Sequence, residues 1–284
     1  MKLASFRTAA GATYGLVTDH GLVDAGARLG RRWPTLRDAL AAPEGLSTLA
    51  ALSAEPATHA LDAVTYLPVI TQPEKVICVG VNYHAHRLET GRDEMPYPTL
   101  FSRFSNTLVG HGAPLVSPRV STQLDFEAEM ALVIGARARH LKAEDALSAV
   151  AGFTCFQDAT VRDWQRHTTQ FTPGKNFVST AGLGPYMVTR DAFGDPRDAE
   201  VVMRLNGVEM QRATTDLLIF DVGRLLAYIT AFTELVPGDI VATGTPGGVG
   251  SKRTPPVFLK PGDVCEVEVR GVGVLRNPVA AEAP

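Results

Sequence analysis

The chain has 284 residues, of which 45% are hydrophobic and 20% are charged, and its formal net charge is −3. This balance is typical of a soluble globular protein with one large domain, or with one domain and a small appendage. No basic stripe indicates nucleic-acid binding, and no apolar run approaches the roughly 20 residues of a membrane helix. The first residues do not read as a signal peptide. We therefore expect a cytoplasmic protein without a nucleic-acid or membrane partner.

The cysteines also indicate a reducing compartment such as the cytoplasm. Cys78, Cys155 and Cys265 are far apart, and each lies in an apolar, strand-like segment. An odd, scattered count without a CxxC pair argues against a disulfide framework and a zinc ribbon. We expect all three to be buried small hydrophobic residues.

The first 70 residues differ from the rest of the chain. Residues 3–23 predict two short strands, and residues 35–40 and 46–52 predict short helices rich in Ala and Leu. Few residues there suit chemistry, and Pro68 and Pro73 bracket a plausible linker. We predict a small N-terminal α/β domain over residues 1–70 and a second domain over residues 71–284.

Strands dominate the second domain. Asn206-Gly207 is a strong two-residue hairpin signal, and the predicted helices are few. Without regular alternation of strands and helices, the pattern favours a mainly β (α+β) fold with mixed, mostly antiparallel sheets. The predicted strands cover residues 76–80, 124–134, 200–205, 239–244 and 264–269, and the predicted helices cover residues 143–151 and 221–232.

The most informative segment is the acidic strand at residues 124–134. Asp125, Glu127 and Glu129 alternate with apolar residues, so a regular strand places them on one face. Neighbouring buried carboxylates repel one another, and a divalent cation with oxygen ligands removes that cost. The alternative is that all three simply face solvent.

Other chemical groups follow predicted strands. His86 and Glu89 are spaced for one helical turn, so the carboxylate can orient the imidazole; the alternative is a surface salt bridge. Asp158 follows an apolar run, where it either completes a three-carboxylate site or caps a helix. Neither Lys175 nor the glycine-rich residues 243–250 fit a phosphate loop or a Rossmann motif, which disfavours nucleotide binding.

Taken in order, these segments resemble the fumarylacetoacetate hydrolase family over roughly residues 74–280. The resemblance rests on five motifs in the family's order rather than on any single one. They are Gly80-x-Asn82-Tyr83-x-x-His86-x-x-Glu89, Asp125-x-Glu127-x-Glu129, Asp158-x-x-x-Arg162-Asp163-x-Gln165, Gly174-Lys175-Asn176-Phe177, and Pro237-Gly238-Asp239 through Thr243-Gly244-Thr245-Pro246-x-Gly248-Val249-Gly250.

The resemblance implies a mixed β-sandwich roll, a homodimer and a set of site residues. Mg²⁺ or Mn²⁺ would be held by Glu127, Glu129 and Asp158, with Asp125 behind them. His86 and Glu89 would activate water, and Lys175 would assist catalysis. The residues implied to contact substrate are Tyr83, Arg162, Gln165, Thr245 and Arg103. Arg103 departs from the family, many members of which carry Lys there.

The implied activity is metal-dependent hydrolysis of the C3–C4 bond of an acylpyruvate, a 2-oxo acid such as fumarylpyruvate or maleylpyruvate. The products would be pyruvate and a carboxylic acid, in aromatic or sugar-acid catabolism. Three alternatives use the same enolate chemistry: an oxaloacetate-like decarboxylase, an isomerase of unsaturated dioic acids, and a hydratase or dehydratase. A different class is a non-enzymatic metal- or ligand-binding β protein. The choice of acid is expected to depend on loops such as residues 90–97 and 166–173.

Overall fold

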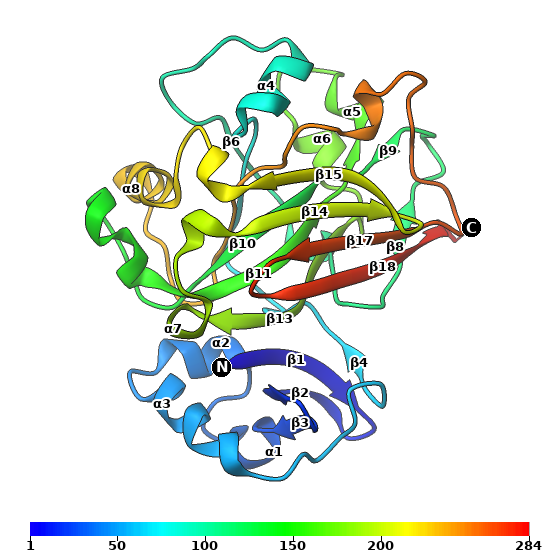
Figure 1. Ribbon diagram of the computed structural model, residues 1–284. Coiled ribbons are helices and arrows are strands. Elements are labelled where there is room, and N and C mark those ends of the chain that lie inside the picture. The colour runs from blue at the N-terminus through cyan, green and yellow to red at the C-terminus, as the bar shows by residue number, and fades with distance from the viewer. Residues whose placement is uncertain (284) are drawn as a thin grey trace.

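The computed structural model describes residues 1–283 and is mainly β, which confirms the predicted fold class (Figure 1). Its largest sheet has eleven strands. In order across that sheet, the strands are β3 (Gly21–Asp24), β2 (Gly11–Thr18), β1 (Lys2–Thr8), β13 (Ala181–Thr189), β11 (Val150–Asp158), β10 (Ala128–Ile134), β16 (Ile240–Ala242), β5 (Val76–Val79) and β6 (Leu100–Ser102), with β4 (Thr65–Tyr66) beside β1 and β7 (Leu108–Val109) beside β13.

A second sheet has five strands, and a separate pair stands apart from both. The five are β15 (Val208–Thr214), β14 (Glu200–Leu205), β17 (Val264–Val269), β18 (Gly273–Ala281) and β8 (Leu115–Ser117), and the pair is β12 (Thr160–Val161) with β9 (Leu124–Asp125). The α-helices are α1 (Gly26–Leu29), α2 (Leu36–Ala41), α3 (Gly45–Ala50), α4 (His84–Thr90), α5 (Arg162–Gln165), α6 (Thr172–Lys175), α7 (Arg190–Phe193) and α8 (Val222–Phe232). The 3₁₀ helices are η1 (Ala51–Ala54), η2 (Ser105–Thr107), η3 (Ala143–Ala149), η4 (Pro196–Asp198), η5 (Thr215–Leu217) and η6 (Gly250–Lys252).

The two sheets pack face to face through alternate residues of β10. Met130 and Leu132 lie in one core cluster with Val201 and residues of β17 from the second sheet. Ala131 and Val133 point the other way, into a cluster shared with β1 and α2. Both faces of β10 are therefore buried, which is why its sequence is a nearly continuous apolar run.

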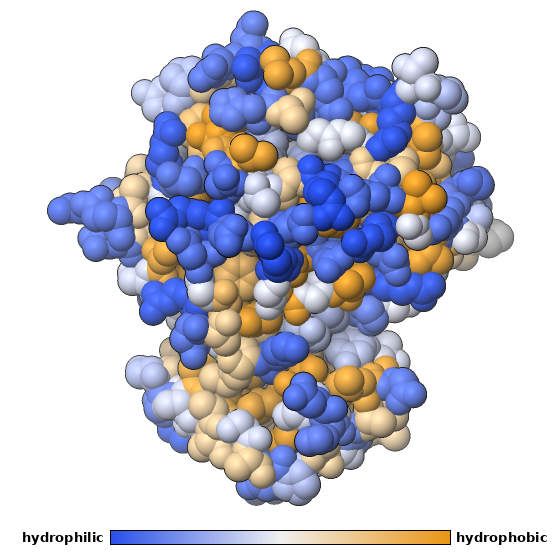
Figure 2. All heavy atoms as spheres, viewed as in Figure 1, coloured by the Kyte–Doolittle hydropathy of each residue, from blue (hydrophilic) through white to orange (hydrophobic). Residues whose placement is uncertain are grey.

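The N-terminal strands and α1–α3 form the lower lobe in Figure 1. Helix α2 begins with a capping box in which Thr35 and Asp38 each bond the other's backbone N–H. Strand β1 pairs with β13, so the large sheet continues from this lobe into the upper one. Figure 2 shows the molecule narrowing between the lobes, with apolar side chains at the surface there. The division at residue 70 stays a prediction, since the sheet runs across it.

The predicted continuous strand over residues 124–134 is wrong in its middle. Strand β9 ends at Asp125 and β10 begins at Ala128, so Phe126 and Glu127 belong to neither. Strand β9 pairs with β12, whereas β10 pairs with β11. The Glu127 N–H donates to the side-chain oxygen of Gln157 at 2.6 Å, and not to a backbone carbonyl as in a regular sheet. The acidic residues therefore do not form one regular strand face.

Two further predictions need correction. The helix expected at residues 143–151 is the 3₁₀ helix η3, and β11 has already begun at Val150. Asp158 is the last residue of β11, and α5 begins only at Arg162, so the helix-cap alternative for Asp158 is wrong. Strand β11 pairs with β10 and β13 on its two sides, which holds the backbone extended as far as Asp158.

Several local predictions are confirmed. Helix α8 follows its N-cap Asp221, and the hairpin between β14 and β15 turns at Asn206 and Gly207, both with positive φ. All three cysteines are buried and free. Among residues 1–283, none of the helices combines the length and apolar character needed to cross a membrane.

A buried asparagine joins the end of β16 to the segment that precedes α8. Asn82 Nδ2 donates to the carbonyls of Phe220 and Thr243 at 3.0 and 2.8 Å, and its Oδ1 accepts from the Phe220 N–H at 2.8 Å. Asn82→Ala leaves these groups buried without partners, so we expect about 3 kcal/mol lower stability in urea unfolding. The control Asn106→Ala, at an exposed position, should change stability by less than about 0.5 kcal/mol. Equal midpoints for the two variants would contradict this account.

Candidate active site

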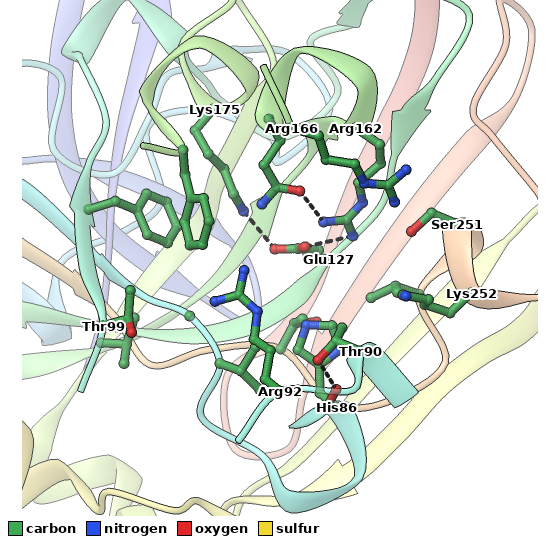
Figure 3. Close-up of a pocket in the computed structure, with 18 of the residues that line it drawn as sticks. His86, Thr90, Arg92, Thr99, Glu127, Arg162, Arg166, Lys175, Ser251 and Lys252 are labelled. Carbon is green, nitrogen blue, oxygen red and sulfur yellow. Dashed lines mark hydrogen bonds and ion pairs between the residues drawn. The ribbon is translucent and has the colours of Figure 1, made fainter. Parts of the chain in front are cut away.

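A cavity of about 540 Å³ lies beyond the carboxyl end of β5 (Figure 3). Its walls come from α4, α5 and α6, from the residues at the start of β10, and from the loop before η6. Segments far apart in the sequence therefore meet around one hollow. The predicted site residues that line it are His86, Glu127, Glu129, Arg162, Gln165, Lys175 and Thr245.

Three buried carboxylates lie together beside this cavity, and two of them, Glu127 and Glu129, line it. One oxygen from each of Glu127, Glu129 and Asp158 lies within 4.8 Å of the others. Strands β10 and β11 are antiparallel neighbours, which brings the start of one beside the end of the other. The Asp158 N–H also donates to the Glu127 carbonyl at 2.9 Å. The alternative that these carboxylates are solvated is wrong, because all three are buried.

Buried cations neutralise two of the three carboxylates. Lys175 Nζ lies 2.7 Å from Glu127 Oε2 and also pairs with Asp158. Arg162 Nη2 lies 2.7 Å from the other Glu127 oxygen, and Arg103 pairs with Asp158. Burial lowers the pKa of Lys175, but the charges of Asp158 and Glu127 outweigh burial and raise it above its usual value. Lys175 therefore remains an ammonium at neutral pH.

Glu129 is the carboxylate without a cation. Among residues 1–283 it forms no ion pair, and it accepts the Gly244 N–H at 2.8 Å. Burial, and then the charge of Asp158, raise its pKa well above the usual value. With Asp125 included, four buried carboxylates face three buried cations, which leaves one negative charge uncompensated. The oxygen donors and this surplus charge fit a divalent cation held by Glu127, Glu129 and Asp158.

Asp125 stands behind this group and fixes its surroundings. Its carboxylate accepts from Arg162 Nε at 2.7 Å and from the N–H groups of Gly250 and Ser251 at 2.8 and 2.9 Å. A Cβ at Gly250 would lie 1.9 Å from the Val257 carbonyl oxygen and 2.6 Å from Asp125 Oδ1. Only glycine fits so close to the carboxylate, and the glycine-rich loop is thereby held against the cavity.

The His86–Glu89 pair is formed. His86 Nδ1 lies 2.6 Å from Glu89 Oε1, and Glu89 Oε2 accepts the Gly248 N–H at 2.9 Å. Burial raises the pKa of Glu89, but the hydrogen bonds from His86 and Gly248 outweigh burial and hold it below the usual value. The surface salt-bridge alternative is wrong, because His86 is buried and lines the cavity. With Nδ1 engaged, Nε2 is the ring nitrogen available for proton transfer.

The remaining predicted substrate contacts divide into two groups. Gln165 and Thr245 line the cavity, where Gln165 Oε1 accepts from Arg162 Nη1 at 3.1 Å. Tyr83 and Arg103 do not line it, contrary to the expectation of direct contact. Arg103 lies fully buried behind Asp158, which it orients, and Tyr83 is buried with no hydrogen-bond partner for its hydroxyl among residues 1–283.

Some cavity residues were not identified individually from the sequence. Arg92, Arg166 and Phe171 belong to the two loops expected to choose the acid, but no motif singles them out. Lys252 follows the glycine-rich loop and carries no signal of its own. These side chains reach the cavity only because their loops fold over it.

Comparisons with known proteins identify the family of this chain. The family model described as fumarylacetoacetate (FAA) hydrolase C-terminal matches residues 75–280. An oxaloacetate tautomerase, Fahd2a of Rattus norvegicus mitochondria, is 43% identical over 217 residues, which are 76% of this chain and 69% of that protein.

Solved structures share the whole fold. A putative HpcE protein from Mycobacterium smegmatis is 32% identical with a TM-score of 0.90, and each chain is covered completely. The maleylpyruvate hydrolase of Sphingobium sp. SYK-6, solved with manganese(II) and pyruvate, is 29% identical with a TM-score of 0.84, again over all of both chains. The family match, the relatives and the five motifs agree, so this chain belongs to the fumarylacetoacetate hydrolase family.

Proposed function

We propose that this protein is a divalent-metal-dependent enzyme that moves a proton at the carbon next to the keto group of a 2-oxo acid. One observation carries the proposal: His86, whose Nδ1 is held by Glu89, lines the same cavity as the carboxylates of Glu127 and Glu129. A structural ion site needs no such pair beside it. The arrangement supports an enzyme over the metal-binding protein considered from the sequence.

The roles follow from the contacts. A cation held by Glu127, Glu129 and Asp158 would supply a Lewis acid toward the carboxylate and keto oxygen of the substrate. Glu89 accepts a hydrogen bond from His86 Nδ1–H, which leaves the Nε2 lone pair free to take a proton. The Lys175 ammonium supplies positive charge beside the carboxylates, where negative charge develops on the substrate.

Keto–enol tautomerisation of oxaloacetate is the first reaction we propose. In this reaction His86 Nε2 would take a proton from C3 and a proton would return to the C2 oxygen, so no water has to be held for attack. The identity to the rat oxaloacetate tautomerase favours it over the other family reactions. The isomerase considered from the sequence acts on unsaturated dioic acids, so this tautomerase reaction is a different isomerisation.

Acylpyruvate hydrolysis is the second candidate. His86 Nε2 would then take a proton from water, and the resulting hydroxide would attack the C4 carbonyl. Two observations favour it: the His–Glu pair suits water activation, and a maleylpyruvate hydrolase shares the whole fold. The same pocket would have to accommodate a longer acyl chain.

One assay separates these reactions. Loss of enol absorbance is followed with oxaloacetate and with a panel of acylpyruvates, first with Mg²⁺ or Mn²⁺ and then with EDTA, while pyruvate is measured with lactate dehydrogenase. Metal-dependent tautomerisation changes the absorbance of oxaloacetate without releasing pyruvate. Hydrolysis releases pyruvate from an acylpyruvate, and decarboxylation releases it from oxaloacetate. Rates equal to the protein-free rate for every substrate would contradict the proposal.

Three predictions from the sequence form part of this proposal. They are a homodimer, a cytoplasmic location, and a small-molecule 2-oxo acid as the sole partner class. The rat relative is a mitochondrial protein, so the compartment is not carried over from it. Sedimentation velocity of the purified chain tests the homodimer directly.

A further inference from the structure

Three cations around the cavity have no charge to neutralise. Arg92, Arg166 and Lys252 line it, and among residues 1–283 none forms an ion pair with a carboxylate. Lys175 and Arg162 differ, because both are already paired with buried acids. All three unpaired residues are exposed, so they form the rim of the cavity rather than its base. A cationic rim above a metal site suits a ligand with negative charge at both ends.

Arg92 is the best placed of the three. It follows Gly91, whose left-handed backbone ends α4, and its guanidinium lies over the Phe171 ring at 4.9 Å from the centroid. Figure 3 shows its side chain pointing into the cavity toward Glu127. Stacking on an aromatic ring restricts a guanidinium while leaving its N–H groups free to bind a carboxylate in two-point fashion.

An aromatic wall connects Arg92 to the base of the cavity. Phe171 meets Phe101 edge to face with ring centroids 5.7 Å apart, and Lys175 Nζ lies 4.8 Å from the Phe101 centroid. The wall therefore runs from the ammonium beside the carboxylates to the guanidinium at the rim. A substrate lying along it has one end at each cation.

Arg92 also borders a second hollow of about 370 Å³, which contains acidic residues. Asp93 and Glu94 line that hollow, and Glu94 lies 4.0 Å from Arg87. The guanidinium forms no ion pair with either acid, and Figure 3 shows it on the side of the main cavity. The position of the guanidinium favours contact with a ligand in the main cavity over an ion pair with Asp93 or Glu94.

We propose that Arg92, assisted by Arg166 and Lys252, binds a second carboxylate of the substrate, at the end remote from the 2-oxo acid group. The enzyme then selects dianionic 2-oxo acids over monoanionic ones. This inference rests on the proposed function, since it assumes that the 2-oxo acid group lies at Glu127, Glu129 and Asp158. Arg92 is a specificity-determining residue in this scheme and takes no part in the proton transfer.

The test uses two unreactive ligands that share a head group. Oxamate and N-oxalylglycine both present an oxalyl group, but only N-oxalylglycine carries a remote carboxylate. Calorimetric titration of the Mg²⁺-loaded protein should show N-oxalylglycine binding about tenfold more tightly or better, the effect of one charge-assisted contact. Arg92→Ala should remove most of this preference and leave oxamate affinity within about twofold. Arg92→Lys should restore part of it.

The matched control is Arg31→Ala, which removes the same charge from an exposed position in the N-terminal lobe. It should keep the full preference, since long-range attraction is screened. A preference unchanged by Arg92→Ala would overturn the role of Arg92. Equal binding of both ligands to the unaltered protein would overturn the second carboxylate site but leave the proposed function standing. Failure of both ligands to bind would overturn the inference and the proposed function together.

Discussion

Replacing His86 with alanine should lower kcat by a factor of about 10²–10⁴ on whichever 2-oxo acid the protein turns over, the usual contribution of a positioned general base. His86 Nδ1 is engaged by Glu89 at 2.6 Å, and among residues 1–283 His86 is the histidine that lines the cavity, so the variant loses the imidazole beside the carboxylates of Glu127 and Glu129. The change removes no carboxylate ligand. Mg²⁺ affinity by calorimetry should therefore stay within about threefold of the unaltered value.

The same helix supplies the control for this variant. His84 is exposed on α4, two residues from His86, and does not line the cavity. His84→Ala should keep full turnover, which separates loss of the base from any general loosening of α4. Unchanged turnover in His86→Ala would remove His86 from the mechanism. Lost metal binding in that variant would instead mean that its folding had been disturbed.

Glu129→Gln should have two effects of opposite sign. Without metal, the variant should be more stable than the unaltered protein at neutral pH, because Glu129 is the buried carboxylate that no cation neutralises. With metal, it should lose the stabilisation by Mg²⁺, which at 100 times the dissociation constant is about 2.7 kcal/mol, or roughly 5–10 °C in Tm. Differential scanning fluorimetry with EDTA and with Mg²⁺ measures both effects.

The pH dependence of this difference has a definite sign. Burial, together with the charge of Asp158, raises the pKa of Glu129 in the folded protein well above its usual value of 4.5. The unfolded chain therefore ionises first, and the favourable contribution of protonated Glu129 is present below about pH 4.5 and is lost as the pH rises through the folded value. In EDTA, the Tm advantage of Glu129→Gln should grow as the pH is raised from about 4.5.

Asp158→Asn is the matched comparison for Glu129→Gln. Asp158 pairs with Lys175 and Arg103, so its loss leaves two buried cations with less compensation and should destabilise the metal-free protein. Both variants should lose the metal-dependent rise in Tm. If Glu129→Gln keeps that rise, Glu129 is not a ligand. If it is less stable than the unaltered protein in EDTA, our charge balance is wrong.

The sequence was most informative where the chemistry is local. His86 and Glu89 are one helical turn apart, so their hydrogen bond could be predicted without knowing the fold. The hairpin at Asn206 and Gly207 and the helix after Asp221 likewise depend on neighbouring residues alone. The family resemblance named Glu127 and Glu129 through the spacing of one motif, although the strand assumed to carry them is interrupted.

The tertiary structure decided how charge is distributed. Asp125, Glu127 and Glu129 look equivalent in the sequence, but only Glu127 and Glu129 lie close to Asp158, whereas Asp125 ends β9 before the break. The cations that pair with these carboxylates, such as Lys175, come from distant segments of the chain. The absence of a cation beside Glu129 could therefore not be predicted from the residues next to it in the sequence.

Residue types and short spacings determined which neighbouring side chains pair with each other, because hydrogen bonds within one helical turn depend on local geometry alone. Only the folded chain decided which groups share a cavity. Arg92 meets Phe171 across nearly eighty positions, and Arg103 lies behind Asp158 although it was expected to meet substrate. Such contacts depend on how distant loops and strands pack, and no local pattern encodes that packing.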